Sequence, residues 1–265
     1  MVYPLISSNT YAKSPGPMTL RNPLRDRYNE LMNRIGEAAG RAGRPANDVL
    51  MVAVTKTASP DQIRQLIDLG HRDLGENRVQ QLQQRVAMTE EFLARRRLMA
   101  AGPKTEPVRW HMIGHLQRNK VKPILPLVKL VHSVDSLRLA EELQAQAVKA
   151  DIDVDILLQV NVSGEESKHG LTLPAVPHMA EQINTMMHLR LRGLMTMAPL
   201  SDEPEASRPI YTRLSELFGE MAKDSTYNEH FNLLSMGMSN DFEVAIECGA
   251  NLVRIGRALF GESDA

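Results

Sequence analysis

Short apolar runs alternate with segments of helical periodicity along this chain, and the alternation repeats eight times. The apolar runs lie at residues 49–55, just before Gly75, and at 108–113, 130–134, 154–162, 189–197, 231–235 and 252–255. Such continuous runs are typical of parallel strands buried on both faces. Because strands that alternate with helices form parallel sheets, eight units favour a closed barrel over an open sheet. The sequence therefore predicts an α/β fold, a single (β/α)8 barrel of the TIM type.

The length of 265 residues suits one large α/β domain. Residues 1–21 mix Pro, Ser, Asn and Gly without periodicity, and we expect them to form a disordered tail. Asn22-Pro23 then opens a helix, and no linker interrupts the pattern that follows. We therefore expect a tail over residues 1–21 and one barrel domain over residues 22–265.

Composition excludes several classes of protein. Lys and Arg number 31 against 32 Asp and Glu, so the chain has no excess positive charge to attract nucleic acid or a membrane surface. No apolar run reaches the roughly 20 residues that span a bilayer. The single cysteine, Cys248, excludes an internal disulfide and any site built from several cysteines. We expect a cytoplasmic protein that binds neither nucleic acid nor membranes.

The barrel fold predicts which residues lie together. In such barrels the residues directly after each strand share the carboxyl-terminal mouth, where ligands bind. The candidates placed there are Lys56, Asn77, His111 or His115, Asn161, Met195 or Met197, Ser235 and Arg254. Lys56 follows the first strand, and Ser59, Pro60 and Gln62 after it predict a capped helix start.

Two glycine-containing turns follow the last two strands. They are Ser235-Met236-Gly237-Met238-Ser239 and Arg254-Ile255-Gly256-Arg257-Ala258. Backbone N–H groups at such turns converge with the positive end of a helix dipole, and the loops after strands seven and eight are the usual phosphate site of barrels. The alternative is that each glycine simply makes a tight turn. Their joint position favours a phosphate cradle that includes Ser235, Ser239, Gly256 and Arg257.

A lysine at the mouth beside a phosphate cradle indicates a phosphorylated aldehyde held as an imine. Burial beside other cations would make the Lys56 amine a better nucleophile, although a solvent-reaching lysine is the commoner case. Two ligand classes fit: pyridoxal 5'-phosphate (PLP), and the sugar phosphate of a Schiff-base class I aldolase. Arg254 helps to separate them, because a guanidinium at the mouth could face the pyridine nitrogen of PLP.

The remaining candidates have structural alternatives. Asn77 could instead cap its helix, and His111 could be a hydrogen-bonded core residue. His111 and His115 are four residues apart, but no acidic third ligand stands near them in sequence, so we expect no metal site. We assign no catalytic residue, since no Ser-His-Asp or Cys-His arrangement is evident.

The same residues belong to segments that resemble a known family. These segments are VAVTK (52–56), LGEN (74–77), WHMIGHLQRNK (110–120), LLQVNVSGEESKHG (157–170), RGLMTMAP (192–199), LSMGMSNDFEVAIECGANLVRIG (234–256) and ALFG (258–261). They resemble, in order over most of the chain, the pyridoxal phosphate homeostasis proteins, which are single-domain relatives of alanine racemase. The resemblance implies a barrel of the alanine racemase N-terminal-domain kind, which is the fold type III of PLP proteins.

The resemblance also implies roles for individual residues. Lys56 matches the family's Schiff-base lysine, and Arg254 matches the arginine that faces the pyridine nitrogen. By the same match, the phosphate is held by Ser235, Ser239, Gly256 and the backbone of Arg257. Asn77 and His111 match other residues of the cofactor pocket.

The implied function is PLP homeostasis inside the cell. Such a protein binds, stores and delivers PLP, affects the balance of amino acids and keto acids, and has apo-enzymes as recipients. The resemblance implies no conventional catalytic activity, and we expect a monomer or a weak dimer. The alternatives are a PLP-dependent amino-acid racemase and, less favoured, a class I aldolase.

Overall fold

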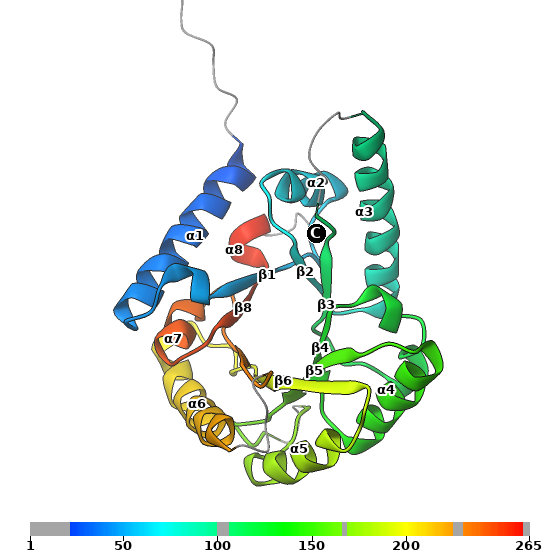
Figure 1. Cartoon of the computed structure of the whole chain (residues 1–265). Coiled ribbons are helices and arrows are strands. Elements are labelled where there is room, and N and C mark those ends of the chain that lie inside the picture. Colours follow the sequence, from blue (N-terminus) through cyan, green and yellow to red (C-terminus); the bar gives the residue numbers. More distant parts are fainter. Residues whose placement is uncertain (1–21, 100–105, 166–168, 225–229, 262–265) are drawn as a thin grey trace, which may run out of the picture.

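A computed structural model of the chain describes residues 22–99, 106–165, 169–224 and 230–261. Eight parallel strands pair in chain order, and the last strand pairs with the first, which closes a barrel (Figure 1). The strands are β1 (Leu50–Val54), β2 (Asp73–Glu76), β3 (Arg109–Met112), β4 (Leu130–Val134), β5 (Val154–Gln159), β6 (Leu189–Met195), β7 (Leu233–Ser235) and β8 (Leu252–Ile255). The predicted TIM-type barrel is therefore confirmed. The expected tail, residues 1–21, lies outside the described residues.

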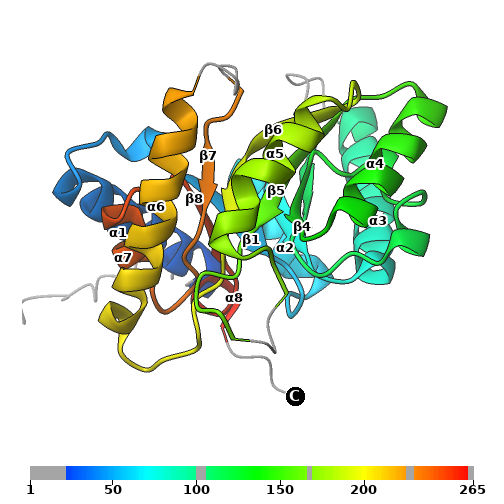
Figure 2. The ribbon, with the colours of Figure 1, turned by 90° about the horizontal axis from the view of Figure 1, so that it is seen from below.

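Helices surround the barrel and alternate with its strands (Figures 1 and 2). They are α1 (Pro23–Arg41), α2 (Pro60–Asp68), α3 (Val79–Met99), α4 (Leu137–Ala150), α5 (Val176–Asn184), α6 (Arg208–Lys223), α7 (Phe242–Glu247) and α8 (Arg257–Phe260). The first helix, α1, precedes the barrel in sequence and contacts both α7 and α8. None of the helices in these described ranges is both long enough and apolar enough to cross a membrane.

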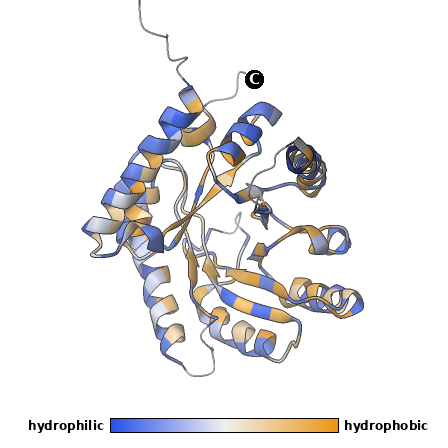
Figure 3. Ribbon diagram, turned by 45° about the horizontal axis from the view of Figure 1, so that its top comes forward, coloured by the Kyte–Doolittle hydropathy of each residue, from blue (hydrophilic) through white to orange (hydrophobic). Residues whose placement is uncertain are grey.

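Apolar side chains form two separate cores. The larger core lies between the barrel wall and the inner faces of the helices, whose outer faces are polar (Figure 3). The smaller core fills the barrel interior and consists of Val52, Leu130, Leu157, Met195 and Leu252. This inner core uses residues from β1, β4, β5, β6 and β8, so the barrel is a packed interior rather than a pore.

The helix α2 begins as its sequence predicts. Ser59 accepts a hydrogen bond from the Gln62 N–H at 3.2 Å, and the Gln62 side chain accepts one from the Ser59 N–H at 2.8 Å. Pro60 occupies the first turn, where its missing N–H costs nothing. Because this reciprocal cap fixes the start of α2, it also fixes the length of the loop that carries Lys56.

Two segments differ from the sequence prediction. The apolar residues of segment 116–127 predict a helix interrupted by proline, but this prediction is wrong, because the chain forms two short 3-10 turns there, Arg118–Lys120 and Leu125–Leu127. Pro123 and Pro126 are the physical reason, because each removes an N–H donor and disfavours helical backbone at the preceding residue. The strand predicted over residues 154–162 ends earlier, at Gln159.

Ion pairs close the amino-terminal end of the barrel. Arg109 donates two hydrogen bonds to the Asp73 carboxylate, at 2.8 Å and 2.6 Å. Asp155 accepts from Arg192 at 2.8 Å and lies 3.2 Å from the Lys129 ammonium. Because ligands of such barrels bind at the opposite end, these pairs serve stability.

Candidate functional site

A cavity of about 550 Å³ opens at the carboxyl-terminal mouth of the barrel. Eight residues selected from the sequence line this cavity: Lys56, Asn77, His115, Met197, Ser239, Arg254, Gly256 and Arg257. His111 and Ser235 are buried and do not line it. Sequence reasoning missed several lining residues, among them Gln159, His169, Leu200, Met238, Asn240 and Asp241. The mouth therefore brings together residues that follow β1, β2, β7 and β8.

Lys56 stands free at the cavity wall. The preceding residue, Thr55, is fully buried and donates its hydroxyl proton to Glu76 at 2.7 Å, which ties the end of β1 to the end of β2. The Lys56 side chain is exposed, so the burial expected from the sequence argument is not found. Within the described residues its amine has no hydrogen-bond or ion-pair partner. The amine is therefore available to a ligand in the cavity.

Asn77 offers the cavity an unpaired acceptor. Its side-chain oxygen is buried and has no hydrogen-bond partner among the described residues, so it does not cap α3. A buried acceptor left unpaired costs about 1–3 kcal/mol, which a donor on a bound ligand would relieve. Gly114 allows the chain after β3 to pass close by, because a Cβ at Gly114 would lie 2.2 Å from the Asn77 carbonyl oxygen.

The turns after β7 and β8 meet at the start of α8. The Ser239 hydroxyl accepts from the N–H groups of Gly256 and Ala258, both at 3.3 Å. These hydrogen bonds are long for N–H to oxygen contacts, which are normally 2.7–3.2 Å. Two N–H donors thus converge on one loosely held hydroxyl at the cavity wall. An anionic oxygen would be a stronger acceptor for the same donors.

Arg254 is a buried cation at the floor of the cavity. It is 4% exposed and donates to the Ser235 hydroxyl at 2.6 Å and to the Thr196 carbonyl oxygen at 2.8 Å. None of the described carboxylates forms an ion pair with it, and the nearby Asp241 instead accepts from the Tyr211 hydroxyl at 2.8 Å. Burial lowers the pKa of Arg254 to about 10, which still leaves it charged at neutral pH. A buried charge without a counter-ion favours an acceptor in the cavity.

A chain of hydrogen bonds runs from Arg254 through the barrel interior. Its members are, in order, Arg254, Ser235, His132, His111, Asp73 and Arg109. The contact between His132 and Ser235, at 3.1 Å, joins β4 to β7, which are not neighbours, so it crosses the interior. His132 contacts His111 at 3.0 Å, and His111 contacts Asp73 at 3.2 Å. The chain thereby links the cavity floor to the ion pairs at the far end.

The two ends of this chain fix the direction of every hydrogen bond in it. Arg254 has donors only, so the Ser235 oxygen accepts from it and the Ser235 proton goes to His132 Nδ1. Burial, which is the largest cause, and the charge of Arg254 hold the pKa of His132 well below its usual range, so its imidazole is neutral. His132 then donates from Nε2 to His111, which donates to Asp73. We assign these tautomers from the hydrogen-bond network.

Asp73 anchors the far end as a carboxylate. Burial alone would raise its pKa, but the hydrogen bonds from Arg109 and His111 outweigh burial and hold the pKa of Asp73 well below its usual range. This chain explains why Ser235 and His111 are placed away from the cavity wall. The Ser235 hydroxyl accepts a hydrogen bond from Arg254 and donates one to His132. Ser235 and His111 are therefore connected to the cavity only through Arg254.

We expect Arg109→Met to destabilise the protein by about 2 kcal/mol at neutral pH. The substitution leaves a buried carboxylate without its ion pair, and the expected loss lies below the usual 3–5 kcal/mol because the Arg109 side chain is 43% exposed. The contribution of Asp73 is complete above its unfolded pKa of about 3.9 and is lost as the pH falls through its lower folded pKa. Urea unfolding at about pH 7 and about pH 3 should therefore show the difference shrinking in acid. An equal difference at both values would contradict the ion pair.

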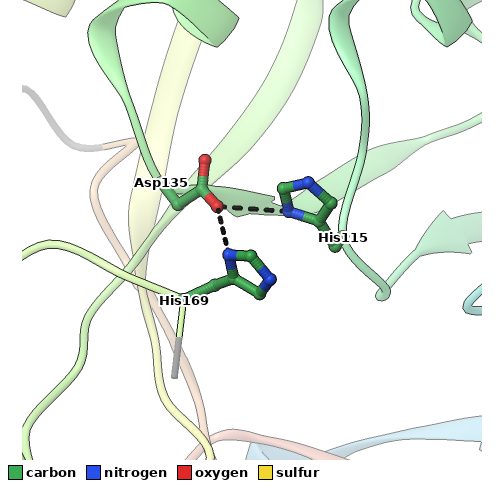
Figure 4. A group of neighbouring side chains, drawn as sticks. All are labelled: His115, Asp135 and His169. Carbon is green, nitrogen blue, oxygen red and sulfur yellow. Dashed lines mark ion pairs between the residues drawn. The ribbon is translucent and has the colours of Figure 1, made fainter. Parts of the chain in front are cut away.

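The structure groups the histidines differently from the sequence. His111 belongs to the buried chain, whereas His115 lies at the cavity rim beside Asp135 and His169 (Figure 4). Asp135, which is 20 positions from His115 in sequence, is therefore its acidic neighbour in space. Sequence spacing could not reveal this group, because its members follow β3, β4 and β5 and meet only when the barrel closes.

The fold and this site together define a class of protein. The family model of the alanine racemase N-terminal domain matches residues 29–264. The structure over these residues is a closed parallel barrel with Lys56 after β1 and the Gly256 turn after β8. The chain is a barrel of the alanine racemase N-terminal-domain class.

Relatives with full-length similarity make the assignment more specific. The pyridoxal phosphate homeostasis protein of Aquifex aeolicus is 40% identical over 237 residues, which cover 89% of this chain and 97% of the relative. The protein of that name from Pseudomonas aeruginosa is 39% identical over 231 residues, covering 87% and 92%. PipY of Synechococcus elongatus, solved with PLP bound, superposes with a TM-score of 0.73 at 27% identity, covering 90% of this chain and 100% of PipY. The chain belongs to the pyridoxal phosphate homeostasis protein family, which confirms the resemblance found in the sequence.

Proposed function

We propose that this protein binds PLP in the cavity at the barrel mouth and serves PLP homeostasis by holding the cofactor and releasing it to apo-enzymes. The observation that carries the proposal is the buried, unpaired charge of Arg254 at the floor of a cavity that also contains a free lysine amine. The cavity volume, about 550 Å³, lies within the range of small-molecule sites. The structure of the relative PipY, which was solved with PLP bound, supports PLP as the ligand of this cavity.

Each part of the ligand has a partner of suitable chemistry in the cavity. When bound, PLP supplies an aldehyde that forms an imine with an amine and a pyridine ring that withdraws electrons. We propose that Lys56 provides the amine and that the turn of Ser239, Gly256 and Arg257 holds the phosphate. Arg254 faces the pyridine nitrogen, and Asn77 accepts a hydrogen bond from the ligand. Ser235 and His111 serve by holding Arg254 in place.

The chemistry of Arg254 favours a protein that holds PLP over an enzyme that uses PLP to convert amino acids. A guanidinium carries donors only and stays protonated, so it pairs with an unprotonated pyridine nitrogen. An unprotonated ring is a weaker electron sink, which disfavours chemistry at the α-carbon of an amino acid. The hydrogen bonds from Arg254 to Ser235 and to the Thr196 carbonyl oxygen hold the guanidinium in place. An amino-acid racemase remains the alternative function, and a class I aldolase is the less favoured one.

Transfer and turnover assays test this function. We expect the PLP-loaded protein to activate an apo-transaminase, and we expect no sustained racemisation or keto-acid production from amino acids. Both assays use the same preparation, with chiral analysis for the second and free PLP at equal concentration as the reference for the first. Repeated turnover on any amino acid would favour the racemase. Failure to activate the apo-transaminase would remove the delivery role while leaving PLP binding intact.

The phosphate turn can be tested with Gly256→Val. A Cβ at Gly256 would lie 3.3 Å from both the Cβ and the carbonyl oxygen of Val54, so the turn must move away from β1. We expect the affinity for PLP to fall at least about tenfold, or 1.4 kcal/mol, and the affinity for pyridoxal to change much less. Gly219→Ala is the matched control, because a Cβ there would meet no atom within 4 Å. Equal losses for the two ligands would place the phosphate elsewhere.

The proposal extends to organisation and partners. We propose that residues 22–265 act as one domain, since a single barrel accounts for every element described, and that the protein works as a monomer or a weak dimer in the cytoplasm. Size-exclusion chromatography with light scattering, with and without PLP, would test the oligomeric state. A tight dimer at low micromolar concentration would contradict it.

A further inference from the structure

Three side chains meet at one side of the cavity rim. His115 follows β3, Asp135 follows β4, and His169 lies between β5 and the 3-10 turn Leu173–Ala175 (Figure 4). The Asp135 carboxylate oxygen lies 3.3 Å from His115 Nδ1 and 3.8 Å from His169 Nδ1. The two imidazole rings stack with centroids 4.2 Å apart, which places both Nδ1 atoms beside the same oxygen. One ligand atom from each residue lies within 4.8 Å of the other two.

Direct pairing does not account for this cluster. A good hydrogen bond between nitrogen and oxygen measures about 2.7–3.2 Å, and neither histidine forms one with Asp135. The Asp135 side chain is only 11% exposed, so water reaches its carboxylate poorly. Within the described residues the three side chains form ion pairs only with one another and make no side-chain hydrogen bonds, although Arg118 and Arg138 line a hollow beside His115 and Asp135. A partner that accepts electron pairs from all three at once would satisfy the group.

A metal ion is such a partner, and the spacing of the cluster suits one. Zinc lies about 2.0–2.2 Å from histidine nitrogen and carboxylate oxygen, so the ligand atoms of a tetrahedral site are roughly 3.3–3.5 Å apart. The shorter contact already has this length. The longer contact and the nearly parallel stacking of the two rings require His169, which is 62% exposed, to rotate so that both rings face one ion. Two imidazoles and one carboxylate suit zinc and its neighbours in the periodic table, whereas magnesium and calcium prefer oxygen ligands.

We propose that His115, Asp135 and His169 form a binding site for one divalent transition-metal ion of the zinc class. Three protein ligands leave a coordination position open to water, and the exposure of His115 and His169 gives the ion a route of entry. Because both histidines also line the cavity, the open position lies at its rim. A bound ion would tie together the loops after β3, β4 and β5. None of the three is a residue proposed to hold PLP, so the proposal does not rest on the proposed function.

Calorimetric titration of the chelator-stripped full chain with Zn²⁺ tests the proposal. We expect one ion per chain with a dissociation constant of about 1 μM or tighter, and a thermal midpoint that rises with Zn²⁺. His169→Ala should weaken binding at least about tenfold, and so should Asp135→Asn. With Co²⁺ as the probe, the spectrum should show ligand-field bands without a thiolate charge-transfer band, because the site contains no cysteine.

Two control variants keep the test specific. His178→Ala removes another exposed histidine with a single acidic neighbour, Glu181 at 3.8 Å, and Cys248→Ser removes the only thiol. Both should bind Zn²⁺ as the parent does. His169→Ala is the decisive variant, since an exposed side chain can be removed without loss of folding, which circular dichroism would verify. Unchanged binding in His169→Ala, or no binding by the parent, would overturn the proposal.

Discussion

Replacing Arg254 with methionine is expected to lower the affinity for PLP at least about tenfold while changing the free energy of unfolding by no more than about 1 kcal/mol. Arg254 is a buried charge that has no carboxylate partner among the described residues, so its removal relieves a desolvation cost that offsets the hydrogen bonds lost to Ser235 and Thr196. Methionine has a similar length and fills the same space without a charge. The affinity for PLP falls because the variant lacks the only residue proposed to pair with the pyridine nitrogen.

The contrasting variant is Arg109→Met at the other end of the buried chain. Both arginines belong to the same buried chain of hydrogen bonds, but Arg109 does not line the cavity. Arg109→Met should therefore lose stability and keep its affinity for PLP, whereas Arg254→Met should do the opposite. Spectrophotometric titration with PLP and urea unfolding of the apo-protein measure the two properties. If both variants lose affinity equally, Arg254 does not contact the ligand.

Lys56→Ala should abolish the covalent attachment of PLP while leaving weaker, reversible binding. The phosphate turn and Arg254 remain in this variant, so we expect the affinity to fall by about tenfold to a hundredfold rather than to vanish. Stability should be almost unchanged, because the exposed Lys56 side chain makes no contact that a described residue would lose. Equilibrium dialysis measures the residual binding, and absorption spectroscopy shows whether the bound ligand is still a free aldehyde.

Lys149→Ala is the matched control for this substitution. Lys149 is an exposed lysine in the last turn of α4 and does not line the cavity. Its removal should leave both the chromophore and the affinity as in the parent. A Lys56→Ala protein with an unchanged imine spectrum would assign the covalent bond to another lysine.

The fold was predictable because its signals are local. Continuous apolar runs define the strands, and the capping box of Ser59 and Gln62 defines the start of α2 without any knowledge of distant residues. The errors also have local causes. Prolines at 123 and 126 prevent the helix that apolar spacing alone suggests. The strand β5 ends at Gln159, and Val160 after it makes an isolated bridge to Leu171.

The sequence predicted only those residues of the candidate site that directly follow strands. Residues that directly follow strands, such as Lys56 and Arg254, must lie at the mouth once a barrel is assumed. The buried chain was not foreseen, because His132 sits in mid-strand and its contact with Ser235 spans 103 positions of sequence. The presence of His132 in the buried strand β4 was a usable signal, since a polar residue inside a barrel requires a partner. Its partner, however, depends on which strands face each other across the interior.

Borohydride reduction of the PLP-loaded protein, followed by peptide mass mapping, tests the central claim most directly. The reaction converts an imine into a stable secondary amine, so it records which nitrogen holds the cofactor. The proposal predicts loss of the imine absorbance and a single modified peptide that carries the reduced cofactor on Lys56. Modification of another lysine, or no modification despite bound PLP, would contradict the assignment of this cavity as a site that holds PLP through Lys56.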